Sequence, residues 1–129
     1  MDGLLHGPRP DADALDQAGW LHFKKGEYEA AGRLYRRALE RGLLAGHAAQ
    51  TRTRLAWVHE RLGEMELAAA LHDEAVEGAG ESAGPWYERA QFRLRRGDRQ
   101  GAIGDLRRAA ELAPGWPPPR ELLRSLGAG

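Results

Sequence analysis

The sequence of 129 residues contains no cysteine, no asparagine and only two lysines, Lys24 and Lys25. The absence of cysteine excludes a disulfide framework and any metal site built on thiolates, and it is compatible with a reducing compartment. No stretch approaches the roughly 20 apolar residues that span a bilayer. The first ten residues lack the apolar run of a signal peptide. We therefore expect a cytoplasmic protein without a membrane segment.

An excess of charge is also missing, because 19 basic residues balance 19 acidic ones. The two signs are unevenly placed: residues 1–84 hold 10 basic and 14 acidic side chains, and residues 85–129 hold 9 and 5. An acidic first half would repel phosphates, which argues against a general nucleic-acid binder. The basic second half leaves room for an anionic contact or for head-to-tail self-association, and the simplest alternative is an unevenly charged solvated surface.

What the sequence does contain is an internal repeat, marked by three glycines that each precede an acid: Gly26, Gly63 and Gly97. A glycine between two helical stretches ends the first helix, because it takes the left-handed conformation without a Cβ penalty. Small residues recur at fixed offsets from each glycine, and they let two antiparallel helices approach closely. These small residues are, in three sets, Gly19, Ala56 and Ala90; Ala31, Ala68 and Ala102; and Ala38, Ala75 and Ala109. The pattern predicts three helical hairpins, the minimum for a stable stack.

This pattern resembles the tetratricopeptide repeat, which has about 34 residues and the signature W-x2-L-G-x2-Y, then A-x3-F, then a closing proline. The three repeats lie near residues 12–45, 49–82 and 83–116. In the order of the signature, the third repeat reads Trp86, Arg89, Ala90, Arg93, Ala102, Leu106, Ala109 and Pro114. The closing proline occurs in the third repeat alone, and the second repeat departs most from the signature. The resemblance implies an all-α fold class, a right-handed α-solenoid of three helix-turn-helix repeats.

The expected organisation is a flexible segment at residues 1–10 and a single domain at residues 11–129. We expect helices at residues 11–24, 28–43, 47–61, 65–78, 83–95, 99–112 and 117–126. Three extra residues between the first two repeats fall within residues 41–47, as a longer helix end or as a loop. The glycine-rich residues 78–85 form the most flexible connection. The last helix has Leu122, Leu123 and Leu126 on one face, so we expect it to cap the third repeat.

In tetratricopeptide modules the first helix of each repeat lines a concave binding surface, so the resemblance implies a peptide-binding groove. The residues it places there are Asp16, Trp20, Phe23 and Lys24 in the first repeat, Thr53, Trp57, Glu60 and Arg61 in the second, and Tyr87, Gln91, Leu94 and Arg95 in the third. Large aromatic rings on a preformed surface often dominate binding energy. We therefore expect a non-catalytic scaffold or adaptor that binds a peptide or protein segment. Chaperone-binding members of the family clamp a terminal carboxylate with Lys and Asn side chains, and a chain without asparagine does not fit that role.

Two other functions compete with peptide binding. Trp20 and Trp57 are also explained as packing residues, covered by Leu4 and Leu5 of the N-terminal segment or by a second copy of the chain in a homo-oligomeric scaffold. Related helical hairpin repeats read RNA, and the best basic cluster for that function is Arg93, Arg95, Arg96, Arg99, Arg107 and Arg108. The zero net charge disfavours this last hypothesis.

The five histidines raise the question of catalysis or metal binding. His22, His59 and His72 stand where the family has aromatic packing residues, which explains them without any chemistry. A metal site on His59 and His72 would lack an evident third ligand. No nucleophile has a base at a known motif spacing, and no phosphate-binding glycine motif is present. We expect no enzymatic activity, no metal and no cofactor.

Overall fold

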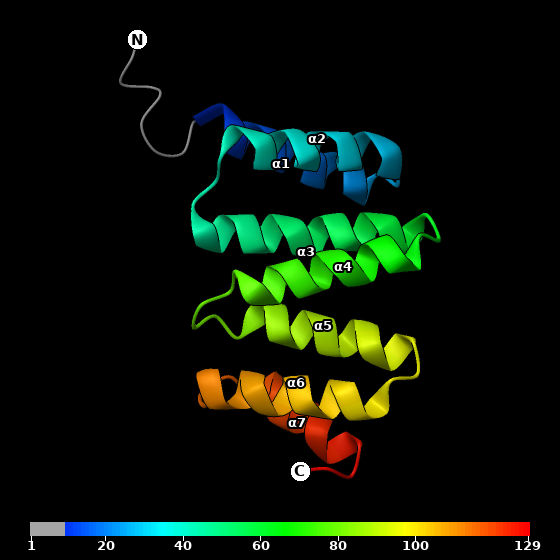
Figure 1. The fold of residues 1–129 in the computed structure, drawn as a ribbon, viewed down its shortest axis with the longest axis vertical. Coiled ribbons are helices and arrows are strands. Elements are labelled where there is room, and N and C mark those ends of the chain that lie inside the picture. The colour runs from blue at the N-terminus through cyan, green and yellow to red at the C-terminus, as the bar shows by residue number, and fades with distance from the viewer. Residues whose placement is uncertain (1–9) are drawn as a thin grey trace. The chain divides into compact units, whose positions relative to one another are not determined.

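The computed structural model describes residues 10–129, which form seven α-helices joined by short connections (Figure 1). Their bounds are α1 Pro10–Lys24, α2 Tyr28–Arg41, α3 Ala45–Arg61, α4 Met65–Glu77, α5 Gly84–Arg95, α6 Arg99–Leu112 and α7 Pro117–Ser125. Each of the seven predicted helices is present, with ends within two residues of the expected positions. Among the described helices, none is both long and apolar enough to cross a membrane. Residues 1–9 lie outside the part of the chain that the structure describes. They include Leu4 and Leu5, which were suggested to cover Trp20 and Trp57.

The chain divides into two compact units at the glycine-rich connection, one ending at Gly78 and the other spanning Ala79–Gly129. The first unit contains α1 to α4, and the second contains α5 to α7. The division falls where the sequence analysis expected the most flexible connection. Each unit is described by itself below.

The turn between the two helices of each repeat closes in the same way. Gly26, Gly63 and Gly97 have φ angles of 83°, 79° and 87°, a region that L side chains rarely adopt. In each turn the acid after the glycine donates its backbone N–H to the carbonyl of a residue in the preceding helix, over 2.8 to 2.9 Å. This bond satisfies a carbonyl that the end of the helix would otherwise leave unpaired. The repeated glycine therefore has the helix-ending role that the sequence predicted.

The small residues of the repeat lie where paired helices meet. Ala31, Ala68 and Ala102 all have 0% exposed surface, as do Ala56 and Ala90. Gly19 shows why bulk is excluded, because a Cβ atom there would stand 2.7 Å from Cε1 of Tyr35. Real Cβ atoms essentially never approach so closely. These close contacts confirm the packing argument drawn from the repeated small residues.

In the first unit, α2 joins the first hairpin to the second by packing against α3. The buried centre of this contact consists of Ala31, Tyr35, Leu55 and Val58. The extra length between the first two repeats is helical, because α3 has 17 residues whereas α5 has 12, and the connection 42–44 is shorter than the connection 78–83. The longer-helix alternative is therefore right. Gly42 in the shorter connection has a φ of 96°. Repeats one and two are thus held together by an apolar core of their own.

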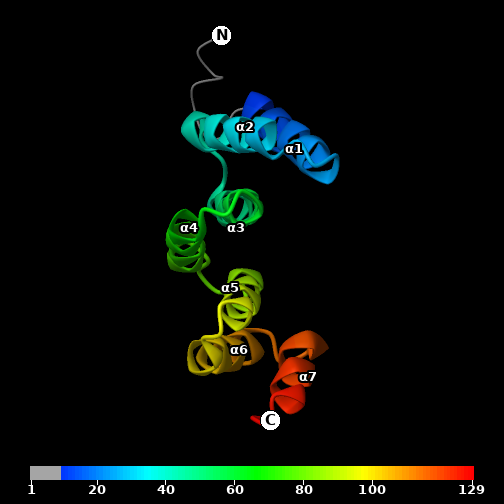
Figure 2. The same cartoon turned by 90° about the vertical axis from the view of Figure 1, so that its right-hand side faces the viewer.

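In the second unit, α7 packs against α6 (Figure 2). Ala90, Ala102, Ile103, Leu106 and Leu123 form the buried centre of this unit. Half-buried Leu122 from α7 and Leu126, the residue after its end, pack against the same centre. The three leucines in and just after the last helix therefore pack against the core around α6, as expected of a capping helix.

Candidate binding surfaces

The first unit carries an aromatic cluster of Trp20, Phe23 and Tyr28 from the first repeat and Trp57 from the second. Trp20 and Phe23 stack with ring centroids 5.8 Å apart and an angle of 12° between their planes. Trp57 of α3 is 6.3 Å from Trp20 and 6.0 Å from Phe23, between centroids. Tyr28 meets Phe23 edge-on at 5.3 Å. All four rings are half-buried, so each keeps part of its surface accessible to solvent.

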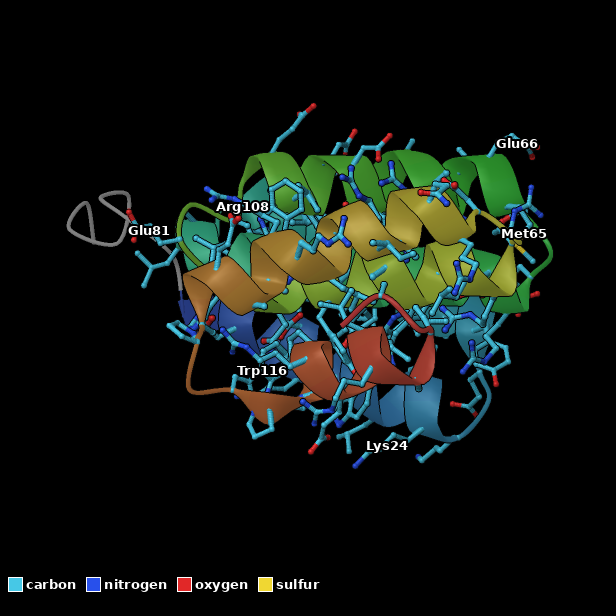
Figure 3. All side chains as sticks on the ribbon, turned by 90° about the horizontal axis from the view of Figure 1, so that it is seen from below. Lys24, Met65, Glu66, Glu81, Arg108 and Trp116 are labelled. Carbon is cyan, nitrogen blue, oxygen red and sulfur yellow. The ribbon has the colours of Figure 1, made fainter. Side chains whose placement is uncertain are left out.

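Three cationic side chains lie over the faces of these rings. Lys24 Nζ is 5.6 Å from the centroid of Trp20, and the guanidinium of Arg61 is 5.5 Å from that of Phe23. The guanidinium of Arg54 is closer still, 4.6 Å from the centroid of Trp20. Cations at such distances are attracted by the ring quadrupole. The aromatic cluster is thus an apolar surface with positive charge along it; the exposed side chain of Lys24 projects away from the ribbon in Figure 3.

Arg54 was missed by the sequence analysis, which counted positions in each repeat from its glycine. The sequence did hold a signal for Arg54: it stands one helical turn before Trp57 on α3, so its side chain lies on the same side of the helix and reaches Trp20 of the first repeat. Asp16, a predicted groove residue, also reaches that neighbour: it accepts a hydrogen bond from the Thr51 hydroxyl at 2.6 Å and lies 3.6 Å from Arg54. Asp16 therefore ties α1 to α3 beside the aromatic cluster.

The remaining predicted groove residues of the first unit differ in exposure. Thr53 is 4% exposed, and its hydroxyl donates to the carbonyl of Ala49 in its own helix. Glu60 is half-buried and Arg61 is exposed. Tyr35, behind this surface, is fully buried, and burial raises the pKa of its phenol far above its ordinary value, partly offset by the charge of Arg54. The hydroxyl of Tyr35 has no hydrogen-bond partner among the described residues.

In the second unit the predicted groove residues Tyr87 and Leu94 are half-buried against the central core. Tyr87 meets Trp116 edge-on, with 5.1 Å between ring centroids, and Figure 3 shows Trp116 beside the start of α7. Burial raises the pKa of Tyr87, and the charges of nearby glutamates add to this effect. Gln91 is half-buried and Arg95 is exposed. Trp116 was not predicted at this surface, because it lies in the connection before α7 and outside the repeated helix positions.

The arginines of the second unit are largely engaged within the unit. Asp105 of α6, with its side chain 4% exposed, accepts two bonds from Arg89, at 2.9 and 3.0 Å, and one from Arg93 at 3.1 Å. Arg99 donates to the carbonyl of Leu126. Arg108 lies over Trp86 and 3.3 Å from Glu111. Of the six arginines proposed as a nucleic-acid cluster, Arg93, Arg99 and Arg108 thus contact groups of the protein itself.

The histidines of the first two repeats form equivalent contacts at the helix ends. His22 Nδ1 lies 2.6 Å from Glu27, and His59 Nδ1 lies 2.7 Å from Glu64. On the opposite side of the His59 ring, Nη2 of Arg36 bonds Nε2. Since arginine only donates, Nε2 accepts, and the ring proton of neutral His59 is on Nδ1 facing Glu64. In residues 10–129 no group of three or more His, Cys, Asp or Glu side chains is placed to hold a metal ion.

Comparison with known proteins identifies the repeat. Residues 12–41, which span α1 and α2, match the family model of the tetratricopeptide repeat. A comparison with curated proteins finds no significant sequence match.

Similar solved structures include the first such repeat domain of Spaghetti (RPAP3) bound to the HSP90 peptide SRMEEVD, with a TM-score of 0.74, 22% identity and 90% of each chain covered. PcrH in complex with the chaperone-binding region of PopB has a TM-score of 0.72 and 19% identity, over 92% of this chain and 93% of that one. The tetratricopeptide domain of Sgt2 from Aspergillus fumigatus has a TM-score of 0.71 and 20% identity, over 95% of this chain and 85% of that one.

The predicted fold class is therefore confirmed, and the resemblance to the tetratricopeptide repeat is supported by the family model over residues 12–41. The matched repeat is the first of three helix pairs, and the seven helices fit three tetratricopeptide repeats followed by a capping helix. The fold is all-helical, with the structural relatives of an α-solenoid.

Proposed function

We propose that the chain is a non-catalytic scaffold that binds a peptide segment on the aromatic cluster of its first unit. The observation that carries this proposal is the meeting of three half-buried rings, Trp20, Phe23 and Trp57, from two repeats. Such rings offer large contact area at a small cost in conformational entropy, because each has only two side-chain torsions. Two solved structures of similar fold hold bound segments, the HSP90 peptide and the PopB region.

The charges around the aromatic cluster favour a particular kind of peptide. Lys24, Arg54 and Arg61 lie at the ring faces. An acidic side chain of the ligand would pair with these cations while a neighbouring apolar side chain contacts the rings. Asp16 balances part of the charge of Arg54. We infer a ligand that alternates apolar and acidic residues, bound in the cytoplasm.

Selection from a random peptide library displayed on phage would test this proposal directly. Peptides enriched on the full chain should be apolar and acidic, and Trp57→Ala should weaken their binding by about 2 kcal/mol or more, roughly thirtyfold. Trp86→Ala is the matched control, because it removes the same side chain from the second unit, and it should leave the affinity within about twofold. Failure to enrich any peptide, or equal losses in the two variants with both folded by circular dichroism, would refute the proposal.

The alternative of a homo-oligomeric scaffold makes a different prediction for the same residues. If a second copy covers the rings, the sedimentation coefficient of the chain should rise with concentration, and Trp20→Ala with Trp57→Ala should abolish that rise. Nucleic-acid binding is the weaker alternative, because at least three of its six proposed arginines contact protein groups.

A further inference from the structure

A pocket lies in the second unit, between α6 and α7, and it shares no residue with the aromatic cluster. Its volume is about 390 Å3. The two helices contribute three arginines to its lining: Arg107 from α6, and Arg120 and Arg124 from α7. Ala110 and Leu123, which are 8% and 6% exposed, provide apolar lining. The pocket therefore combines converging positive charge with an apolar wall.

The positive charge of this pocket is not balanced by its own lining. Glu111 is the one acid among the lining residues, and it is engaged with Arg108, which is not part of the lining. Arg120 and Arg124 are four residues apart on one face of α7, a spacing at which like charges repel and destabilise the helix. An anion bound between them would remove this repulsion. Among the side chains of the lining, three arginines stand against one carboxylate that is already paired, and Ala128 and Gly129 complete the lining.

The geometry of Arg120 also suits the binding of an anion. Its Nη1 donates to the carbonyl of Pro114 at 2.6 Å, which holds the guanidinium at the connection before α7. A guanidinium has five N–H donors in a planar fork, so this one bond leaves most of them available for a second acceptor. The fork matches two oxygens of a phosphate or a carboxylate.

We propose that this pocket binds a phosphate monoester whose organic group packs against Ala110 and Leu123. A phosphate monoester carries a charge of about −1.5 to −2 at pH 7, which matches the charge of the lining better than a single carboxylate does. The volume is at the lower end of the range of about 300–1,000 Å3 for ligand pockets, and it exceeds what one phosphate group fills. The monoester is either a free small molecule or a phosphorylated side chain of a partner, since both present the same chemistry.

Titration of the full chain, followed by the amide signals in nuclear magnetic resonance spectra, would test this proposal. The probes are phenyl phosphate, inorganic phosphate and benzoate, each at constant ionic strength. We expect saturable shifts in α6 and α7 with phenyl phosphate at a Kd of about 1 mM or below. Inorganic phosphate should bind more weakly because it lacks the apolar group, and benzoate because it carries one charge.

Arg124→Gln and Arg107→Gln should each weaken the binding of phenyl phosphate about tenfold while the spectrum of the folded protein persists. Arg37→Gln is the matched control, because it removes the same charge from an exposed position of α2 and should change the Kd less than twofold. The proposal is overturned if no shift saturates below about 10 mM, if the control loses as much affinity, or if benzoate binds as tightly. A peptide carrying phosphotyrosine that binds more tightly than phenyl phosphate would identify a protein partner, and equal affinities would identify a small molecule.

Discussion

The second and third repeats use the same hairpin frame but fill equivalent positions with different chemistry. The place four residues before the turn glycine holds His59 in the first unit and Arg93 in the second. His59 bridges Arg36 of a neighbouring repeat and Glu64 of its own turn. Arg93 lies 3.9 Å from Asp98 of its own turn and, unlike His59, shares the buried carboxylate of Asp105 with Arg89 inside a single hairpin. The frame therefore needs only small residues and glycine at fixed positions, and the polar contacts around it are free to vary.

Removing the carboxylate of Asp105 should have the largest effect on stability. Asp105→Ala leaves two arginines facing each other, with side chains 15% and 30% exposed. Breaking a fully buried pair costs about 3–5 kcal/mol, and the partial exposure of the arginines lowers our expectation to roughly 2–4 kcal/mol. Urea denaturation followed by circular dichroism measures this loss. Glu111→Ala, whose side chain is 67% exposed, is the control, and a loss as large there would contradict the assigned role of Asp105.

Enlarging a small residue of the frame should come next. Ala68→Leu places three extra carbons at a fully buried position between α3 and α4. Overpacking of this kind costs about 1–3 kcal/mol. Ala70→Leu makes the same change at an exposed position of the same helix, and its free energy of unfolding should stay within about 0.5 kcal/mol of the original. Equal midpoints of thermal unfolding for the two variants would show that Ala68 is not a close-contact position.

The two equivalent histidines should respond unequally to removal. The His59 side chain is 6% exposed and contacts two partners, whereas that of His22 is 39% exposed and contacts Glu27. His59→Ala empties a buried position and removes the contacts with Arg36 and Glu64, whose own side chains reach solvent, at about 1–3 kcal/mol. His22→Ala should cost less than about 1 kcal/mol because water replaces the lost contact. Chemical denaturation of both variants at pH 7 measures the two losses in free energy of unfolding. A larger loss for His22→Ala than for His59→Ala would refute the bridge from Arg36 through His59 to Glu64.

Tyr35→Phe should have the smallest effect at neutral pH, because the hydroxyl that it removes makes no hydrogen bond. We expect a change within about 0.5 kcal/mol or a small gain. The effect should grow in alkali, because the folded pKa of Tyr35 lies above the ordinary value of 10.0. The phenol ionises near pH 10 in the unfolded chain but only at higher pH in the folded protein. Its contribution to folding stability is therefore complete below pH 10 and is lost as the pH rises further. The original chain should therefore lose stability above pH 10 faster than Tyr35→Phe does in parallel urea titrations.

The helix positions and the pairing within each repeat followed from the sequence, because they depend on short-range rules. Turn glycines and small residues at fixed offsets act over one helix and its neighbour, so Gly63 and Ala68 were assigned correctly from their spacing alone. The rings at Trp20 and Trp57 were placed together for the same reason, since equivalent positions of successive repeats lie side by side. Their role in binding remains a proposal.

Only the tertiary structure decided which long side chains meet. Arg54 lies over Trp20 of another repeat, and Trp116 meets Tyr87, and neither pair occupies equivalent positions of the repeat. The pocket beside Arg120 depends on the angle at which α7 returns over α6. A long, flexible side chain has many rotamers, and its partner is chosen by the packing of helices far apart in sequence. The local pattern of residues therefore determines the frame, while the contacts on its surface are determined by how the helices assemble.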